Sequence, residues 1–218
     1  MEIDEAMSTL RAVRRLKPDP IPPEVLSRVL QAAAWAPTGG NVQPFRIVTV
    51  SAPELLEEIQ GLYAQEWSRY TADMRAEGDE LALPRQKMMR AGDYLAANMA
   101  SIPVLAVFCF NPHLMAITDA GLDRPSVVGG GSVYTAVQNF MLAARAEGLG
   151  CVLTTLLCFQ EAKLKELLDI PPDWGTCAHV PLGYPVLGGH GVISRRPISK
   201  LVYENRWGRA KQELEGNE

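Results

Sequence analysis

Four short apolar runs, spread along the chain, limit most strongly what it can fold into. They read FRIVTV at 45–50, PVLAVFCF at 103–110, CVLTTLL at 151–157 and CAHVPLG at 177–183. Each run is short and apolar, rich in β-branched or aromatic residues, so each is predicted to be a buried strand. Because segments with helical spacing lie between them, we predict an α+β or α/β fold in which helices cover a sheet.

Helical periodicity and capping residues mark the segments between these strands. Ser51 and Glu54 form an S-x-x-E pattern, which predicts a capped helix start. Ser132 is expected to cap a buried helix that Gly148 ends, and Pro37 is expected to stop an earlier helix. The predicted helical segments are 22–37, 51–63, 71–101, 132–150 and 160–168.

Charge and cysteine usage exclude several classes of protein. The formal net charge of −4 argues against a general nucleic-acid binder, which usually carries a basic excess. The four cysteines show no C-x-x-C spacing, so we expect neither a disulfide framework nor a metal site, and a reducing compartment fits best. No stretch approaches about 18 apolar residues, and residues 1–10 lack a signal-peptide pattern. We therefore expect a cytoplasmic protein without a membrane partner.

The common catalytic motifs are missing from the sequence. The triple glycine at 129–131 has neither the G-x-G-x-x-G spacing nor the lysine of a P-loop. No H-E-x-x-H and no G-x-S-x-G is present, and the three histidines lie on different segments. His179 falls in a predicted strand, where a core role is the simpler interpretation. The absence of these motifs favours a reaction whose chemistry a bound cofactor carries.

Two arginine clusters could bind the phosphate of such a cofactor. Arg11, Arg14 and Arg15 lie near the N-terminus, and Arg195 and Arg196 lie near the other end. Guanidinium groups match phosphate oxygens in bidentate fashion, so the clusters are candidate anion sites. The alternative is a solvated face, or arginines placed against the dipole at the end of a helix.

The stretch APTGGNVQPF, at 36–45, is unusual for a helix–strand junction. Gly39 and Gly40 permit close backbone approach, Asn41 and Gln43 offer amide groups, and Phe45 adds an aromatic ring. A flat conjugated ring needs such partners along its polar edge.

Taken in order, these segments resemble the FMN-dependent nitroreductase superfamily. The resemblance is carried by RAVRRLKPDPIP, APTGGNVQPF, VQNFMLAARAEGLGCVLTT, VPLGYP and the late RRP…RWG, and it covers roughly 8–208. It implies one FMN-binding domain over 1–218 with an α+β fold, a mostly antiparallel sheet and an intertwined homodimer. A variable lid region is expected at about 71–131. Within it, residues 111–131 show no clean period and are expected to set substrate choice. A C-terminal extension is expected at about 197–218.

The resemblance also implies which residues contact FMN. The N-terminal group would contact the phosphate, ribityl chain and ring edge, although Ala12 replaces a frequent serine. The turn would pack on the flavin of the partner subunit, with Thr38 and Phe45 in place of the usual serine and tryptophan. Thr154, Thr155 and Leu156 would lie beside the N5 edge of the flavin ring. Arg195 and Arg196 would bind the phosphate. The expected residues are Arg11, Ala12, Val13, Arg14, Arg15, Pro37, Thr38, Gly39, Asn41, Gln43, Thr154, Thr155, Leu156, Arg195 and Arg196.

The implied activity is a ping-pong reaction. NAD(P)H would pass a hydride to the flavin, and a nitroaromatic, quinone or related acceptor would then be reduced in the same site. Arg14 is the candidate that stabilises negative charge on the reduced ring. Alternatives on the same scaffold are flavin breakdown, reductive dehalogenation or use of a deazaflavin, and a flavin-binding protein without turnover is a further alternative.

Overall fold

A four-stranded antiparallel sheet forms the centre of the protein in its computed structural model, which describes residues 1–78, 82–186, 188–209 and 211. The strand order is β1-β2-β4-β3, and every pair of neighbouring strands is antiparallel. The strands are β1 (Phe45–Val50), β2 (Val104–Phe110), β3 (Gly150–Cys151) and β4 (Gly175–Gly183). The predicted α+β fold with a mostly antiparallel sheet is confirmed.

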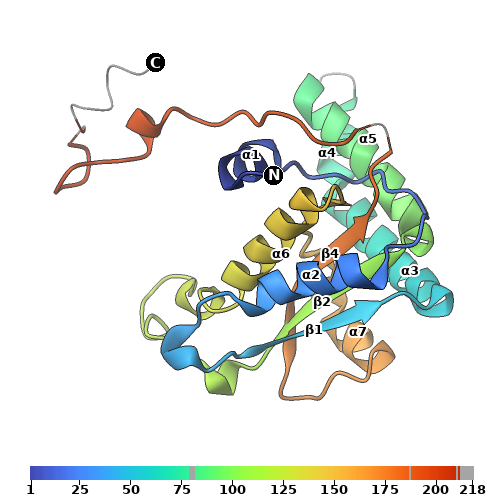
Figure 1. The fold of residues 1–218 in the computed structure, drawn as a ribbon, viewed down its shortest axis with the longest axis horizontal. Coiled ribbons are helices and arrows are strands. Elements are labelled where there is room, and N and C mark those ends of the chain that lie inside the picture. The colour runs from blue at the N-terminus through green and yellow to red at the C-terminus, as the bar shows by residue number, and fades with distance from the viewer. Residues whose placement is uncertain (79–81, 187, 210, 212–218) are drawn as a thin grey trace.

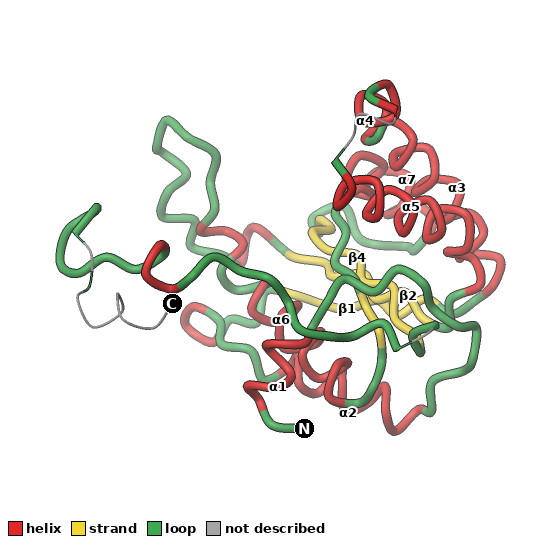
Figure 2. The backbone as a smooth tube through the Cα atoms, turned by 90° about the horizontal axis from the view of Figure 1, so that it is seen from above, coloured by secondary structure: helices red, strands yellow, loops and turns green. Residues whose placement is uncertain are grey.

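Helices cover both faces of this sheet, as Figures 1 and 2 show. Successive side chains of a strand point to opposite faces, and β2 is buried on both. Its Ala106 and Phe108 pack toward α2 and α6, whereas Leu105 and Val107 pack toward α3 and α5. The helices are α1 (Ile3–Thr9), α2 (Pro23–Ala34), α3 (Pro53–Tyr70), α4 (Ala72–Ala76), α5 (Leu83–Asn98), α6 (Tyr134–Ala146) and α7 (Glu161–Leu167).

Short 3-10 helices form several of the connections. The stretch 111–131 is a long connection, as predicted, and it holds two of these helices. The predicted helical character of 71–101 is confirmed outside residues 79–81, which are not described. The 3-10 helices are η1 (Gly39–Asn41), η3 (Met99–Ser101), η4 (Pro112–Leu114), η5 (Val128–Gly130), η6 (Leu156–Gln160) and η7 (Ile198–Lys200).

The strand predicted over 151–157 is wrong. Only Gly150–Cys151 pair as β3, followed by one isolated bridge between Thr154 and His179. Thr155 then has a φ of −120° and a ψ of 3°, which directs the chain into η6 rather than along the sheet. The apolar run is explained by burial of Leu156 and Leu157 against the core, not by strand pairing.

Two predicted helix caps are also wrong. Helix α3 begins after Ala52, one residue later than predicted, so its capping position holds an alanine that has no side-chain acceptor, and no side chain caps the helix. Helix α6 begins after Val133, and the Ser132 hydroxyl instead accepts a hydrogen bond from the Gly39 N–H at 3.1 Å. The C-terminal prediction is confirmed, since Gly148 follows the end of α6 with a φ of +77°.

After β4 the chain leaves the layered body. Residues 188–209 run past α1 and extend well beyond the helices (Figure 1). Two backbone hydrogen bonds connect them to the N-terminal segment, from Gly191 N to Thr9 O at 3.4 Å and from Ile193 N to Ser8 O at 3.1 Å. Val192 is 83% exposed and Trp207 is 92% exposed on this arm. We refer to residues 188–209 as the C-terminal arm.

Candidate functional site

The N-terminal arginines lie on an extended segment along the edge of the sheet. Helix α1 ends at Thr9, and the Val13 N–H then donates to Cys151 O at 2.9 Å. The side chains of Val13 and Leu16 are buried in the core, which turns the arginines between and around them outward. The alternative in which these arginines oppose the dipole at a helix end is therefore wrong.

One of these arginines lines a cavity of about 340 Å³ between the sheet edge and helices α3 and α5. Its volume lies within the range of small-molecule sites, roughly 300–1,000 Å³. The cavity brings Arg14 together with three other residues that were predicted to contact the cofactor. It is lined by Arg14, Tyr63, Trp67, Tyr70, Met88, Val152, Leu153, Thr154, Thr155 and Leu156.

Arg14 carries a positive charge that no carboxylate balances. It makes no hydrogen bond or ion pair with any other described residue. Burial lowers the pKa of Arg14 from its ordinary value, while the nearby Tyr63 acts in the opposite direction. A partly desolvated cation at a cavity wall favours an anionic ligand, because the ligand supplies the missing counter-charge.

The segment 152–156 lies between β4 and α3. The backbone N–H groups of Thr154 and His179 each donate to the other's carbonyl oxygen, at 3.0 and 2.9 Å. On the other side, Tyr63 of α3 lines the same cavity as Thr154. Burial lowers the pKa of His179 to about 4, so its imidazole is neutral, which agrees with its predicted core role. Its Nδ1 lies 3.3 Å from Thr154 O, while Nε2 has no hydrogen-bond partner among the described residues.

Aromatic residues of α3 form the opposite wall, and they were not among the residues predicted from the sequence. The Trp67 indole N–H donates to Asp93 Oδ1 at 2.8 Å, and Arg75 forms an ion pair with the same carboxylate. Tyr63, Trp67 and Tyr70 recur at spacings of four and three residues, so they share one face of the helix. That spacing was visible in the sequence, but it is equally typical of a core face. Met88 of α5 was also missed.

The turn at 36–45 lies elsewhere, beyond the C-terminal end of α2 and away from α3 and α5 (Figures 1 and 2). Gly40 and Asn41 both have a φ of 58°, and Gln43 has a φ of 48°. Left-handed backbone at a non-glycine residue is uncommon and needs support. The support comes from the Gln43 side chain, which donates to Asn41 Oδ1 at 3.2 Å, and from Thr38 Oγ1, which accepts the Gln43 N–H at 3.1 Å.

Two further contacts fix this turn to α6. Gly39 donates to Ser132 as described above, and the Thr135 hydroxyl donates to Pro37 O at 3.3 Å. Gly39, Gly40, Asn41 and Gln43 remain exposed, so their polar groups face outward. The turn is therefore a rigid, exposed set of amides, but it does not line the Arg14 cavity of its own chain.

The structure thus brings together only some of the residues that were predicted to contact FMN. Arg14, Thr154, Thr155 and Leu156 share one cavity. Arg15 lies 4.9 Å from the centre of the Tyr94 ring, Arg11 and Ala12 are exposed, and Val13 presents its side chain to the core. Arg195 and Arg196 are exposed on the C-terminal arm, where Arg195 contacts only the neighbouring Ser194 O.

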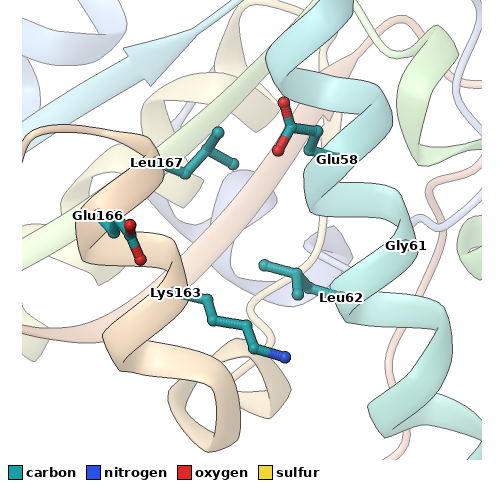
Figure 3. A pocket seen from close by; sticks show the side chains of 6 residues that line it. All are labelled: Glu58, Gly61, Leu62, Lys163, Glu166 and Leu167. Carbon is teal, nitrogen blue, oxygen red and sulfur yellow. The ribbon is translucent and has the colours of Figure 1, made fainter.

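A more spacious groove, of about 570 Å³, lies between α3 and α7 (Figure 3). Leu62 and Leu167 face each other across it, and Glu58, Lys163 and Glu166 carry charges at its sides. It holds none of the predicted site residues. Its lining offers neither an aromatic wall nor an arginine, so it is the poorer candidate for a phosphate-bearing ring. Among the described residues, no helix is both long and apolar enough to cross a membrane.

The fold and the cavity together define an α+β protein in which aromatic side chains and a partly buried arginine, unpaired among the described residues, line one cavity. Comparison with known families identifies it further: residues 9–184 match the nitroreductase family, and the chain belongs to that family. The resemblance seen in the sequence is confirmed.

Individual relatives differ in what they do. The chain is 30% identical to the 5,6-dimethylbenzimidazole synthase of Rhodobacter capsulatus over 185 residues, 84% of this chain and 83% of the relative. A structure of oxidised iodotyrosine deiodinase, bound to FMN and 3-iodo-L-tyrosine, has a TM-score of 0.69 at 22% identity, covering 89% of this chain and 95% of that one. An NADPH:FMN oxidoreductase of Vibrio harveyi, in complex with NAD⁺, has a TM-score of 0.67 at 21% identity, covering 97% and 80%.

Proposed function

We propose that the protein is an FMN-dependent NAD(P)H oxidoreductase that reduces small organic acceptors such as nitroaromatics and quinones. The observation that carries the proposal is the unpaired, partly buried Arg14 in one cavity with Thr154, Thr155 and Leu156. Membership of the nitroreductase family supports it independently. When bound, FMN supplies a ring that accepts a hydride at N5 and delivers it to a second substrate.

The residues of the cavity fit this cofactor. The guanidinium of Arg14 stabilises negative charge at the edge of a bound ring, and stabilisation of developing charge is worth most in a partly desolvated site. The Thr155 N–H makes no hydrogen bond to another described residue, so it is free to donate to a ring nitrogen or oxygen. FMN is also present in the structurally similar deiodinase.

The turn at 36–45 is proposed to contact the flavin of a second copy of the chain. The exposed amides of the turn and the arginines of the C-terminal arm lie outside the Arg14 cavity of their own chain. In a homodimer, the turn of one copy would complete the cavity of the other, and the arm would bring Arg195 and Arg196 to a flavin phosphate. This arrangement accounts for why the turn is rigid but faces outward.

A steady-state assay tests the proposal. Purified protein is supplied with FMN, NADH or NADPH, and 1,4-benzoquinone or nitrobenzene, and nicotinamide oxidation is followed by absorbance. We expect turnover that requires both FMN and the acceptor. A protein that retains FMN but gives no acceptor-dependent oxidation with either nicotinamide contradicts the proposal.

The similarity to 5,6-dimethylbenzimidazole synthase supports flavin breakdown as the second candidate function. The same Arg14 cavity would then hold FMN as the substrate. Incubation with reduced FMN in air, followed by mass spectrometry, separates the two candidates. Formation of 5,6-dimethylbenzimidazole supports the second, and recovery of intact FMN supports the first. Dehalogenation is tested in the same way with 3-iodo-L-tyrosine, and use of a deazaflavin by substituting that cofactor for FMN.

A further inference from the structure

His179 is a polar residue in the middle of an apolar strand. Strand β4 runs through the inside of the sheet, and the neighbours Ala178 and Val180 are fully buried. The His179 side chain is itself 0% exposed. It lies opposite Val107 of β2, so both side chains point to the face of the sheet that carries α3, α5 and the Arg14 cavity.

Packing alone does not require an imidazole at this position. Burial lowers the pKa of His179 to about 4, so the ring is neutral and carries one proton. Nδ1 lies 3.3 Å from Thr154 O, and Nε2 has no hydrogen-bond partner among the described residues. A buried polar atom without a partner costs free energy that an apolar side chain of similar size does not. The histidine is therefore unfavourable for the core, and what it adds is the contact with Thr154.

This contact determines where the proton of the imidazole lies. A carbonyl oxygen only accepts hydrogen bonds, so the ring nitrogen that faces it must donate. The proton of the neutral ring is therefore on Nδ1, and Nε2 carries a lone pair. The Thr154 oxygen then accepts two hydrogen bonds from one residue, from the His179 backbone N–H at 2.9 Å and from Nδ1 at 3.3 Å. Both lone pairs of this oxygen are occupied.

The two bonds orient the peptide group that joins Thr154 to Thr155. A trans peptide group is planar, and its C=O and N–H point in opposite directions. Thr154 O points inward to β4, so the Thr155 N–H points outward, where Thr155 is exposed and lines the Arg14 cavity. This N–H makes no hydrogen bond to another described residue. It is available to a ligand in the cavity.

A single bridge connects this peptide group to the sheet. Strand β3 ends at Cys151 and η6 begins at Leu156, and the bridge from Thr154 to His179 is the one pairing between them in the described part of the chain. Hydrogen bonds to a carbonyl oxygen also polarise the peptide, and each added bond strengthens its N–H as a donor by about 10–30%. The ring of His179 thus acts on both the direction and the strength of the Thr155 N–H.

We propose that His179 is a positioning residue for the flavin site: its ring and backbone N–H groups hold the peptide group between Thr154 and Thr155 so that the Thr155 N–H is a fixed and strengthened donor to the bound ring. The identity of that ring rests on the proposed function. A donor at the ring edge stabilises the reduced flavin, which is richer in electrons, more than the oxidised flavin. His179 therefore favours reduction of a flavin that it does not touch.

The position of the imidazole proton is measured without flavin. In the full chain labelled with ¹⁵N-histidine, the ring shifts of His179 should show a proton on Nδ1 and none on Nε2 near neutral pH. The signals of His179 are those that disappear in His179→Leu. A proton on Nε2, or a charged ring, overturns the proposal. Because no FMN is present, this result stands even if the protein binds no flavin and the proposed function fails.

Two variants of nearly equal shape separate positioning from packing. Asparagine places a side-chain N–H close to the position of Nδ1, whereas leucine has no donor, and both leave a similar space unfilled. With FMN bound, the ratio of reduced to oxidised flavin at equilibrium with a reference dye should fall about threefold in His179→Leu, because the Thr155 N–H becomes a weaker donor to a charged ring. His179→Asn should recover most of the wild-type ratio. Without flavin, the Thr155 amide proton should shift upfield in His179→Leu and return in His179→Asn.

Unfolding in urea provides the control. His179→Leu buries no polar side-chain atom, so its midpoint should equal or exceed that of His179→Asn, which adds a buried amide oxygen. If His179 only packed, the flavin ratio would follow stability. A larger loss in His179→Asn than in His179→Leu, or a ratio unchanged in both, therefore contradicts the proposal. If neither variant folds, the wild-type measurement still decides, with His179 assigned by its contact with Thr154, since a proton on Nε2 excludes the ring hydrogen bond.

Discussion

At the scale of single residues, Arg14 is a partly buried arginine without a carboxylate partner in the described part of the chain, unlike several other arginines of the protein. Arg14 has no carboxylate partner among the described residues, whereas Arg75 and Arg124 each pair with an aspartate. A charge that is left unpaired at a cavity wall is costly unless a ligand completes it. The contrast supports the proposal that Arg14 binds the ligand, whereas Arg75 and Arg124 pair within the protein.

Removal of this charge should weaken FMN binding. Arg14→Gln is expected to cost about 1.5–3 kcal/mol of binding free energy, the usual contribution of a hydrogen bond to a charged group. Arg85→Gln, on the exposed side of α5, is the matched control and should leave the affinity unchanged. The measurement is a titration of flavin fluorescence quenching in both variants. Equal FMN affinities of Arg14→Gln and wild type would show that Arg14 does not bind the flavin.

Asp119 gives a prediction about pH. Hydrogen bonds from Ser126, from the Val127 N–H and from Arg124 lower the pKa of Asp119 to about 2, compared with an ordinary value of 3.8. Because the folded-state pKa is depressed, this carboxylate stabilises the fold fully above the unfolded value, and the contribution is lost as the pH falls from about 4 toward 2. Asp119→Asn should therefore lower the denaturation midpoint at pH 7, and the difference from wild type should shrink below pH 3. A difference that is the same at both pH values contradicts this account.

At the scale of elements, the sequence predicts best those helices and strands whose conformation depends on residues close to one another in the sequence. Strands β1 and β2 were both predicted because short runs of β-branched and aromatic residues favour strands, although only β2 is buried along nearly its whole length. The 151–157 segment failed because its conformation depends on Thr154 meeting His179, a contact across 25 positions. For the same reason Ser132 looked like a helix cap, although its partner, Gly39, lies 93 positions away. The site was predictable in its arginine and threonines, but not in the aromatic face of α3.

Packing between α3 and α5 supplies an element-scale prediction. A Cβ on Gly92 would lie 2.1 Å from Cζ2 of Trp67, so Gly92→Ala should force the indole away from α5. We expect a loss of about 1–3 kcal/mol of unfolding free energy, the typical cost of overpacking. Gly61→Ala is the control, because its Cβ would meet nothing within 4 Å, and replacing a helical glycine should be mildly stabilising. Urea unfolding of both variants tests the prediction, and equal stability would contradict it.

At the scale of the whole molecule, the residues predicted to contact FMN lie in three places that one chain does not bring together. The Arg14 cavity lies at α3 and α5, the turn lies beyond α2, and the C-terminal arm extends away from both (Figure 1). An arm with Val192 and Trp207 exposed is typical of a segment that packs on another protein. A homodimer remains a prediction, and it is the simplest arrangement in which all predicted FMN contacts meet.

Arg196 tests the C-terminal part of this arrangement, because it is exposed on the arm and does not line the Arg14 cavity. Arg196→Ala should weaken FMN retention by about 1.5–3 kcal/mol, while Arg209→Ala, on the same arm, should not. Analytical ultracentrifugation of wild type and Arg196→Ala should show dimers in both cases. A monomeric wild-type protein that still binds FMN tightly would contradict the shared site.

The most direct test of the central claim is an anaerobic absorbance experiment on the FMN-loaded protein. Addition of NADH or NADPH should bleach the flavin band near 450 nm, the usual position for oxidised flavins, within seconds, and later addition of 1,4-benzoquinone should restore it with a stoichiometry of about one quinone per flavin. Two half-reactions that can be separated in this way are what a ping-pong oxidoreductase requires. A flavin band that neither nicotinamide bleaches, or that stays bleached after quinone is added, would contradict the account.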